Sequence, residues 1–391
     1  LAVVTLQLGP GPDLDNTIVA EVRRPDGTVV SVSFSAQALP LPDTANRLVM
    51  MSGDNQGYDG EHVVASELPL PLVVRVVDTM RTGVDEDPMG APIPNFPVLF
   101  TAYSPSGDGT VSANPDNEPA GTGRLTALTD EDGLAAVRWT LGTETGGPDD
   151  LDFLRHNNHV VAVAVFADGT QDSVIFLATG VPQAAASISP AGPTQLSAIA
   201  GTSITGLGVN VADRFGNPVN GVVVTYSIGD TPGGGWISQP GRPTNTYGYT
   251  EVTIDQLATK VGDMVITASI GKSDVSPVSF TITVKADDPV EMLLADGDGQ
   301  SSEVGTAFTA ALKVLIFDQY RNLVPDVLVS FQLTGGSASL SPIIALTDNE
   351  GAAECTVTPL AEGNITVVAT ATISGVPTTE TFSLVATAAE E

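Results

Sequence analysis

The chain of 391 residues is strongly acidic: 46 Asp and Glu side chains stand against 15 Lys and Arg, which gives a formal net charge of −31. A charge of this sign repels phosphate backbones and anionic lipid headgroups, so neither nucleic acid nor a membrane surface is an expected partner. Hydrophobic residues make up 42% of the chain, so it is expected to fold, and its length corresponds to two to four domains. No run of about 18 apolar residues is present, so we expect no membrane span in this segment.

The local pattern predicts an all-β protein. Short runs such as Val222–Tyr226 and the alternating Phe280–Val284 are separated by turns, and the chain holds 40 Gly and 28 Pro. No segment keeps a 3.6-residue apolar period over three turns, as an amphipathic helix would. Short strands at regular spacing indicate β-sandwiches or barrels.

The first predicted element, residues 1–44, lines up with a later part of the chain. Leu1–Gly9 matches Leu134–Gly142, and Asn16–Ala38 matches Asn158–Gly180. We therefore expect residues 1–44 to be the last three strands of a domain, closed by a hairpin from Asn16 to Ala38. Three strands with a bare edge are marginal alone. We expect the natural polypeptide to continue upstream of Leu1, rather than another chain to supply the missing strands.

Residues 45–182, 183–286 and 287–391 are predicted to be three further domains, because they repeat the same turns in the same order. Each has an Asp that ends a strand, a second strand, and then a turn that closes on a glycine. These glycines are 115 and 103 residues apart, which is about the length of one sandwich domain. The junctions are short and contain proline, which predicts stiff spacers. The marker residues are Asp78, Asp213 and Asp318, and the glycines are Gly133, Gly248 and Gly351.

These turns resemble those of the bacterial immunoglobulin-like domain of the invasin and intimin type. The pattern of that domain is a Gly-Asp-x-Gln turn, the marker Asp, Gly-Asn-Pro-Val before the next strand and a Thr-Asp-x-x-Gly turn. The resemblance implies tandem immunoglobulin-like Greek-key β-sandwiches arranged as a rod, and an extracellular, cell-surface location. The matching residues include Gly53–Gln56 and Thr129–Gly133, then Gln195, Gly216–Val219 and Thr244–Gly248, and finally Asp296–Gln300, Arg321–Val324 and Thr347–Gly351.

Residues 45–182 differ from the other repeats by insertions. Asp78 and Gly133 are 55 residues apart, against 35 and 33 for the equivalent pairs, because of extra segments near 81–90 and 105–124. Another extra stretch runs from 143 to 157. In a Greek-key sandwich the first insert is expected at the pole facing residues 1–44, and the other two at the pole facing residues 183–286. They either brace these junctions or carry a ligand, as long loops on rigid sandwiches often do.

The chain offers little for catalysis, and we predict no catalytic, cofactor-binding or metal-binding residues. The histidines are His62, His156 and His159, with no Gly-x-Ser-x-Gly turn in the chain. The last two are three residues apart, which in a strand places their side chains on opposite faces. We therefore prefer an exposed loop before a strand to a metal site, and we do not expect an enzyme.

Asp296 and Asp298, in the run Asp-Gly-Asp-Gly, are similar to the start of a calcium-binding loop. The twelve-residue ligand pattern with a closing Glu does not follow, and the third repeat has Gly192–Thr194 at the same turn. A solvated turn is the preferred interpretation. Calcium binding by the two aspartates stays the alternative, and no cofactor is predicted.

The single cysteine excludes an internal disulfide. Cys355 aligns with Val137 and Val252, so we expect a core position rather than a reactive thiol. Trp139 also aligns with core positions. Trp236 follows three glycines in a loop, where we expect it to be exposed.

The sequence thus predicts a non-catalytic extracellular structural protein, a segment of a large cell-surface protein whose domains form a rigid stalk or pack into a layer, sheath or filament. Its expected partners are neighbouring copies of itself or other cell-surface proteins. One alternative is an adhesin or carbohydrate-binding segment that recognises a receptor or glycan. Another is a set of accessory domains of a secreted hydrolase. The two tryptophans do not supply the aromatic cluster that a glycan platform would need.

Overall fold

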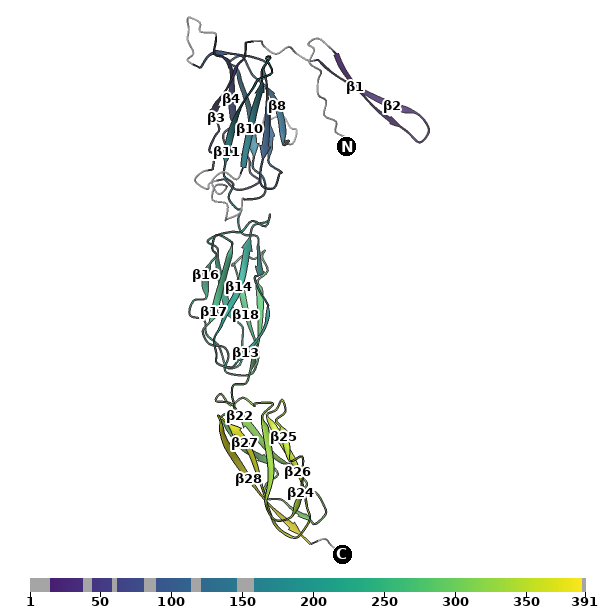
Figure 1. Ribbon diagram of the computed structural model, residues 1–391, viewed down its shortest axis with the longest axis vertical. Helices are drawn as coiled ribbons and strands as arrows, with labels where there is room; N and C mark the ends of the chain where they lie inside the picture. Colours follow the sequence, from purple (N-terminus) through teal and green to yellow (C-terminus); the bar gives the residue numbers. More distant parts are fainter. Residues whose placement is uncertain are drawn as a thin grey trace. The chain divides into compact units, whose positions relative to one another are not determined.

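The computed structural model describes residues 15–37, 44–57, 62–80, 89–113, 121–145 and 158–388. Throughout these ranges the regular elements are strands, which confirms the predicted all-β class. They form one hairpin and three sandwiches (Figure 1). We number the sandwiches second, third and fourth, because the first place is kept for the partial domain predicted at 1–44. No helix in the described part of the chain is long and apolar enough to cross a membrane. By their contacts the residues fall into two compact units, 1–183 with 215–217 and 184–214 with 218–391.

The hairpin pairs β1 (Asp15–Arg23) with β2 (Val29–Gln37), one residue from the range expected from the alignment at each end. Ile18 lies opposite Phe34, as Val160 lies opposite Phe176 in the closing hairpin of the next repeat. The turns of the two hairpins carry the same hydrogen bond, from a Thr hydroxyl to the Asp two residues before it, at 2.6 Å in both. The two hairpins therefore share a cross-strand pair and a turn. Residues 1–9 lie outside the described ranges, and a partial domain at 1–44 stays a prediction.

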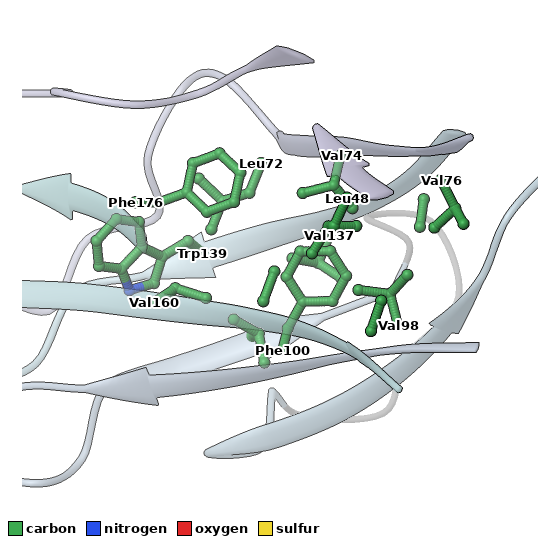
Figure 2. Packing of buried hydrophobic residues seen from close by; sticks show 14 of the residues in the cluster. Leu48, Leu72, Val74, Val76, Val98, Phe100, Val137, Trp139, Val160 and Phe176 are labelled. Carbon is green, nitrogen blue, oxygen red and sulfur yellow. The ribbon is translucent and has the colours of Figure 1, made fainter. Parts of the chain in front are cut away.

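The second sandwich packs a sheet of order β3-β4-β9-β7, with β5 beside β4, on a sheet of order β11-β10-β6-β8. Alternate residues of each strand point between the sheets. They bury a core that includes Phe100, Trp139 and Phe176 (Figure 2). The strands are β3 (Arg47–Ser52), β4 (Leu72–Asp78), β5 (Ala91–Pro92), β6 (Pro97–Tyr103), β7 (Thr110–Ser112), β8 (Arg124–Leu128), β9 (Leu134–Thr140), β10 (Asn158–Val165) and β11 (Gln171–Ala178).

The third sandwich packs a sheet of order β12-β14-β17 on one of order β13-β19-β18-β15-β16. Its core includes Tyr226, Ile254 and Phe280. β13 pairs parallel with β19, and the other pairs are antiparallel. The strands are β12 (Ser187–Pro190), β13 (Gln195–Ile199), β14 (Ile204–Ala212), β15 (Val223–Ile228), β16 (Gly241–Pro243), β17 (Tyr249–Ile254), β18 (Gly262–Ser269) and β19 (Val278–Lys285).

The fourth sandwich has the same two-sheet plan, with orders β20-β22-β26-β24 and β21-β28-β27-β23-β25. Phe331, Cys355 and Phe382 lie in its core. In each sandwich the chain crosses repeatedly between the sheets, as in a Greek key. The strands are β20 (Glu291–Asp296), β21 (Ser301–Glu303), β22 (Leu312–Phe317), β23 (Leu328–Gly335), β24 (Ala338–Ser341), β25 (Ile344–Leu346), β26 (Ala352–Pro359), β27 (Gly363–Ile373) and β28 (Val376–Thr387).

The Thr-Asp-x-x-Gly turn ties the two sheets together through its side chains. The Thr347 hydroxyl donates to the carbonyl of Val324 at 2.8 Å and accepts the N–H of Val327 at 2.9 Å. Asp348 accepts two backbone N–H groups of its own turn, at 2.9 and 3.0 Å. Gly351 has a φ of +64°, a region that favours glycine. The polar residues of this motif are therefore used to build the turn.

Candidate functional site

The Gly-Asp-x-Gln turn of the fourth sandwich, the candidate calcium loop, is held by hydrogen bonds to the backbone. Asp298 accepts the N–H of Ser383 at 2.7 Å, which ties the turn to β28. Gln300 donates to the carbonyls of Gly297 and Ala310 at 2.7 and 2.8 Å, and accepts the N–H of Ala310 at 2.8 Å. The amide group is thereby fully used. The turn is a structural lock between strands.

The same lock recurs in the second sandwich and is absent from the third. Asp54 accepts the N–H of Leu177 at 2.9 Å, and Gln56 bonds to the backbone on both sides of its turn. In the third sandwich Gln195 is an exposed residue at the start of β13. Within the described ranges no three His, Cys, Asp or Glu side chains are grouped as metal ligands. The absence of calcium from this turn nevertheless remains a prediction.

The predictions for the cysteine and the tryptophans agree with the structure. Cys355, Val137 and Val252 are each buried, and burial raises the pKa of the Cys355 thiol. This confirms a shared core position. Trp139 is buried, and its indole Nε1 is the buried side-chain N or O atom without a hydrogen-bond partner in the described part of the chain. Trp236 is exposed, as expected.

The loop predicted for the two nearby histidines is wrong for His159. His159 is the second residue of β10, and its ring stacks on Tyr103 of β6 with 4.8 Å between the centroids. Burial lowers the pKa of its imidazole, so the neutral form is favoured. The strand begins at Asn158, where the alignment placed the start of the closing hairpin, so His159 lies in the strand and not in the loop before it. Asn158 is buried and accepts the N–H of Gly142 at 2.9 Å. His156 lies outside the described residues.

One sheet of the second sandwich presents an apolar outer face, which sequence analysis did not identify. The residues of β10 that point away from the core are His159, Val161, Val163 and Val165, and each lies opposite a residue of β11 that also points outward. Four side chains of this surface are between 47% and 56% exposed. We call this surface the apolar face; its members are Leu99, Tyr103, Leu128, His159, Val161, Val163, Val165, Ile175 and Leu177. The same strands also point Thr101, Arg124, Thr126, Gln171 and Ser173 outward, at the positions between and beside these residues.

The corresponding outer face of the third sandwich is mainly polar, and that of the fourth is mainly polar along β27, although Leu328, Ile344 and Leu346 of β23 and β25 are exposed. In β18 and β19 of the third sandwich the outward positions include Thr267, Thr281 and Thr283. In β27 of the fourth they include Thr366 and Thr370. Apolar surface on a soluble domain marks a site of interaction when it is contiguous. The apolar face of the second sandwich is therefore the candidate functional site.

Parts of the inserts of the second sandwich lie within the described residues. The Thr143 hydroxyl donates to Asp108 at 2.6 Å, which joins the ends of two inserts. Burial raises the pKa of Asp108, but hydrogen bonds from Ser106 and Thr143 outweigh it and lower the pKa. The remaining parts, 81–88, 114–120 and 146–157, lie outside the described residues.

Comparison with known proteins gives one family and several relatives. Residues 306–383 match the family "Bacterial Ig-like domain (group 1)". The chain is similar to the inverse autotransporter adhesin YeeJ of Escherichia coli strain K12, with 25% identity over 375 residues, which is 94% of this chain. The chain spans only 14% of the length of that protein.

Two solved structures are also similar. One is invasin, described as a bacterial integrin-binding protein, with 18% identity, a TM-score of 0.40 and coverage of 87% of this chain and 60% of that chain. The other is the Escherichia coli adhesin FdeC, with 17% identity, a TM-score of 0.44 and coverage of 88% and 98%. Both TM-scores are below 0.5, so the fold assignment rests on the strand orders and cores described above.

The strand orders and cores define the chain as an array of immunoglobulin-like β-sandwiches. The family match at residues 306–383 and the similarity to the adhesin confirm the predicted resemblance to the bacterial immunoglobulin-like repeats of invasin and intimin. The relatives are cell-surface adhesins, which agrees with the predicted extracellular location of this segment. Neither the family description nor the name of the relative refers to an enzymatic activity.

Proposed function

We propose that this chain is a non-catalytic stalk segment of a cell-surface protein, in which tandem sandwiches at 45–182, 183–286 and 287–391 follow a partial domain at 1–44. The observation that carries the proposal is how the recurring polar residues are used. Thr347, Asp348, Asp298 and Gln300 each bond to the backbone of a turn or of a neighbouring strand. The recurring polar side chains of the repeat therefore stabilise its fold. The function we propose for the repeat is to hold other parts of the protein at a fixed spacing.

Composition and relatives support this proposal. A net charge of −31 keeps a long exposed surface soluble. Short junctions with proline limit bending between sandwiches. The relative YeeJ is an adhesin of which this chain matches a small fraction, so a segment of a larger cell-surface protein is the form we propose. Neighbouring copies and other cell-surface proteins are the partners we propose.

Electron microscopy of the purified full chain tests the stalk proposal. We expect extended particles of uniform length, without added metal. Compact particles, or particles folded back at every junction, would show that the array does not act as a spacer.

A second function, lateral packing of copies, is favoured by the apolar face. We propose that the apolar face packs against the same face of a second copy of the chain. The net negative charge makes two copies of the chain repel each other over most of their surface. On the apolar face this repulsion is weak, because among the Lys, Arg, Asp and Glu residues of β6, β8, β10 and β11 only Arg124 points outward. Exclusion of water from the apolar side chains would then stabilise the pair.

Analytical ultracentrifugation of a double variant tests this packing. Val161→Thr with Ile175→Thr makes the face resemble its polar counterparts, and Val265→Thr on the third sandwich is the matched control. We expect the natural chain and the control to self-associate at high concentration and the double variant to stay monomeric. A natural chain that stays monomeric at all concentrations contradicts packing of copies. If that monomer binds cells or glycans through the same residues, the adhesin alternative replaces it.

A further inference from the structure

The turn after the marker Asp of the fourth sandwich reaches into the third sandwich, within one compact unit. The Asn322 side chain is 4% exposed. Its Nδ2 donates to Asp318 at 2.8 Å and to the carbonyl of Thr259 at 2.9 Å, and its Oδ1 accepts the N–H of Val261 at 3.2 Å. Thr259 and Val261 lie between β17 and β18. Both donors and the acceptor of this amide are therefore used. Two of the three bonds cross the junction between the third and fourth sandwiches.

Neighbouring residues strengthen the same junction. Tyr320 packs on the core of the third sandwich, and its backbone carbonyl accepts a hydrogen bond from the Lys260 ammonium. A Cβ on Gly201 would lie 2.1 Å from the Tyr320 hydroxyl, so the ring sits directly against the third-sandwich backbone. Asp318 in turn accepts the N–H of Asp287 in the linker at 3.0 Å. Linker, turn and preceding loop thus form one bonded unit.

The same pair of bonds occurs at Asn217, which belongs to the other compact unit. Its Oδ1 accepts the N–H of Thr145 at 2.9 Å and its Nδ2 donates to the carbonyl of Thr143 at 2.8 Å. As with Asn322, the bonded N–H and carbonyl come from residues two positions apart, in a loop that follows a strand. The pattern is a property of the repeat.

The second sandwich lacks this asparagine. Pro92, Pro218 and Leu323 pair with equivalent residues of the preceding strand, which places Ala91 at the position of Asn217 and Asn322. The residue at the Tyr320 position is Met80, which is 86% exposed. An alanine side chain has no polar group with which to bond a preceding loop.

We propose that the asparagine at this turn is an interdomain clasp, and that the surface it fits is the loop between β17 and β18 of the preceding sandwich. Ala91 leaves the second sandwich without the clasp. The proposal deepens the stalk function, because it names the residue that stiffens a junction. The coupling it describes is nonetheless a property of the folded chain, measurable whether or not the chain acts as a stalk.

Amide hydrogen exchange of the full chain tests the clasp. Asn322→Ala removes the bonds, and Asn349→Ala, an exposed asparagine of the same sandwich, is the matched control. We expect the Val261 amide to exchange about tenfold faster in Asn322→Ala, the factor that the loss of a hydrogen bond of ordinary strength produces. The Ala352 amide, bonded within the fourth sandwich to Asp348, is expected to keep its rate.

Two outcomes would overturn the clasp. One is an unchanged Val261 amide in Asn322→Ala. The other is equal acceleration of Val261 and of Ala352, which would mean that Asn322 supports only its own sandwich. Lys260→Met provides a second test from the opposite side of the junction, because it removes the bond to Tyr320 without touching the fourth sandwich. We expect it to accelerate Val261 by a smaller factor.

Discussion

The second and fourth sandwiches share a framework and differ in what they present at their surfaces. Both have the locking Gln, at 56 and 300, and both close on the same turn around a glycine. The fourth carries Asn322 where the second has Ala91, and threonines point outward from its β27 where valines point outward from β10 of the second. The comparison teaches that the repeat separates two tasks. The turn residues specify the fold. Residues at the end of a sandwich, such as Asn322, and residues on its outer sheet face specify what that sandwich contacts.

The largest effect is expected at the shared turn glycines. A Cβ at Gly133 would lie 2.8 Å from the Val76 carbonyl, and one at Gly351 would lie 3.0 Å from the Ile316 carbonyl. Gly133→Ala and Gly351→Ala should therefore each cost about 2–3 kcal/mol in calorimetry, from strain at a positive φ plus a backbone clash. Gly299→Ala, with φ +72° and open space around it, is the control and should cost less. Clearly unequal losses of unfolding free energy in Gly133→Ala and Gly351→Ala would contradict the shared framework of the two sandwiches.

Next in size is the marker aspartate, where the two sandwiches should differ. Burial alone would raise the pKa of Asp318, but hydrogen bonds from Asn322, Asp287 and Tyr320 outweigh it and lower the pKa. A carboxylate whose folded pKa is depressed stabilises the fold above its unfolded pKa, and that stability is lost as the pH falls through the folded pKa. The melting temperature of the fourth sandwich should therefore fall with acidification below about pH 4.

Asp318→Asn should remove this acid sensitivity and cost about 2 kcal/mol at neutral pH, because an amide does not accept all of these bonds. Asp78→Asn, at the equivalent position of the second sandwich, should cost less. An acid profile of Asp318→Asn identical to that of the natural chain would refute the assignment.

A smaller loss is expected at the buried thiol. Cys355→Ser should destabilise the fourth sandwich by about 1–2 kcal/mol, because it buries a hydroxyl without a suitable partner. Cys355→Val, which copies Val137 and Val252, should stay within about 1 kcal/mol of the natural chain. Denaturant unfolding measures both. Rapid labelling of Cys355 by a thiol reagent in the native state would contradict its core position.

The smallest effect is expected from metal. Asp54 and Asp298 already accept backbone N–H groups, so calcium or a chelator should leave the melting temperatures of all three sandwiches unchanged within about 1 °C, a shift smaller than that of a single weak interaction. A shift confined to the second and fourth sandwiches would instead identify the Gly-Asp-x-Gln turn as a cation site.

The sequence predicted the parts of the fold that depend on local chemistry. Glycines at positive φ, Thr and Asp side chains in turns and alternating apolar strands all leave local signatures, and their recurrence located the sandwiches and the core position of Cys355. Contacts between elements were missed. Asn217 and Asn322 were interpreted as turn formers, although Ala91 at the equivalent position was a usable signal that the turn itself does not need asparagine.

The apolar face was missed for a related reason. Val161, Val163 and Val165 alternate with buried residues on β10, so the whole run is apolar and its period of two is hidden. Such a run is typical of a strand covered on both sides. Only the register with β6 and β11 shows that one side is open.

The central claim, that the repeat supplies geometry through bonded junctions, is tested most directly by the distance between the third and fourth sandwiches. Ser279→Cys and Thr381→Cys, in a Cys355→Val background, place spin labels on exposed positions of β19 and β28 in the full chain. Double electron–electron resonance should give one narrow distance distribution, which broadens when Asn322→Ala is added. A distribution that is already broad with Asn322 in place, or that Asn322→Ala leaves unchanged, would contradict the account.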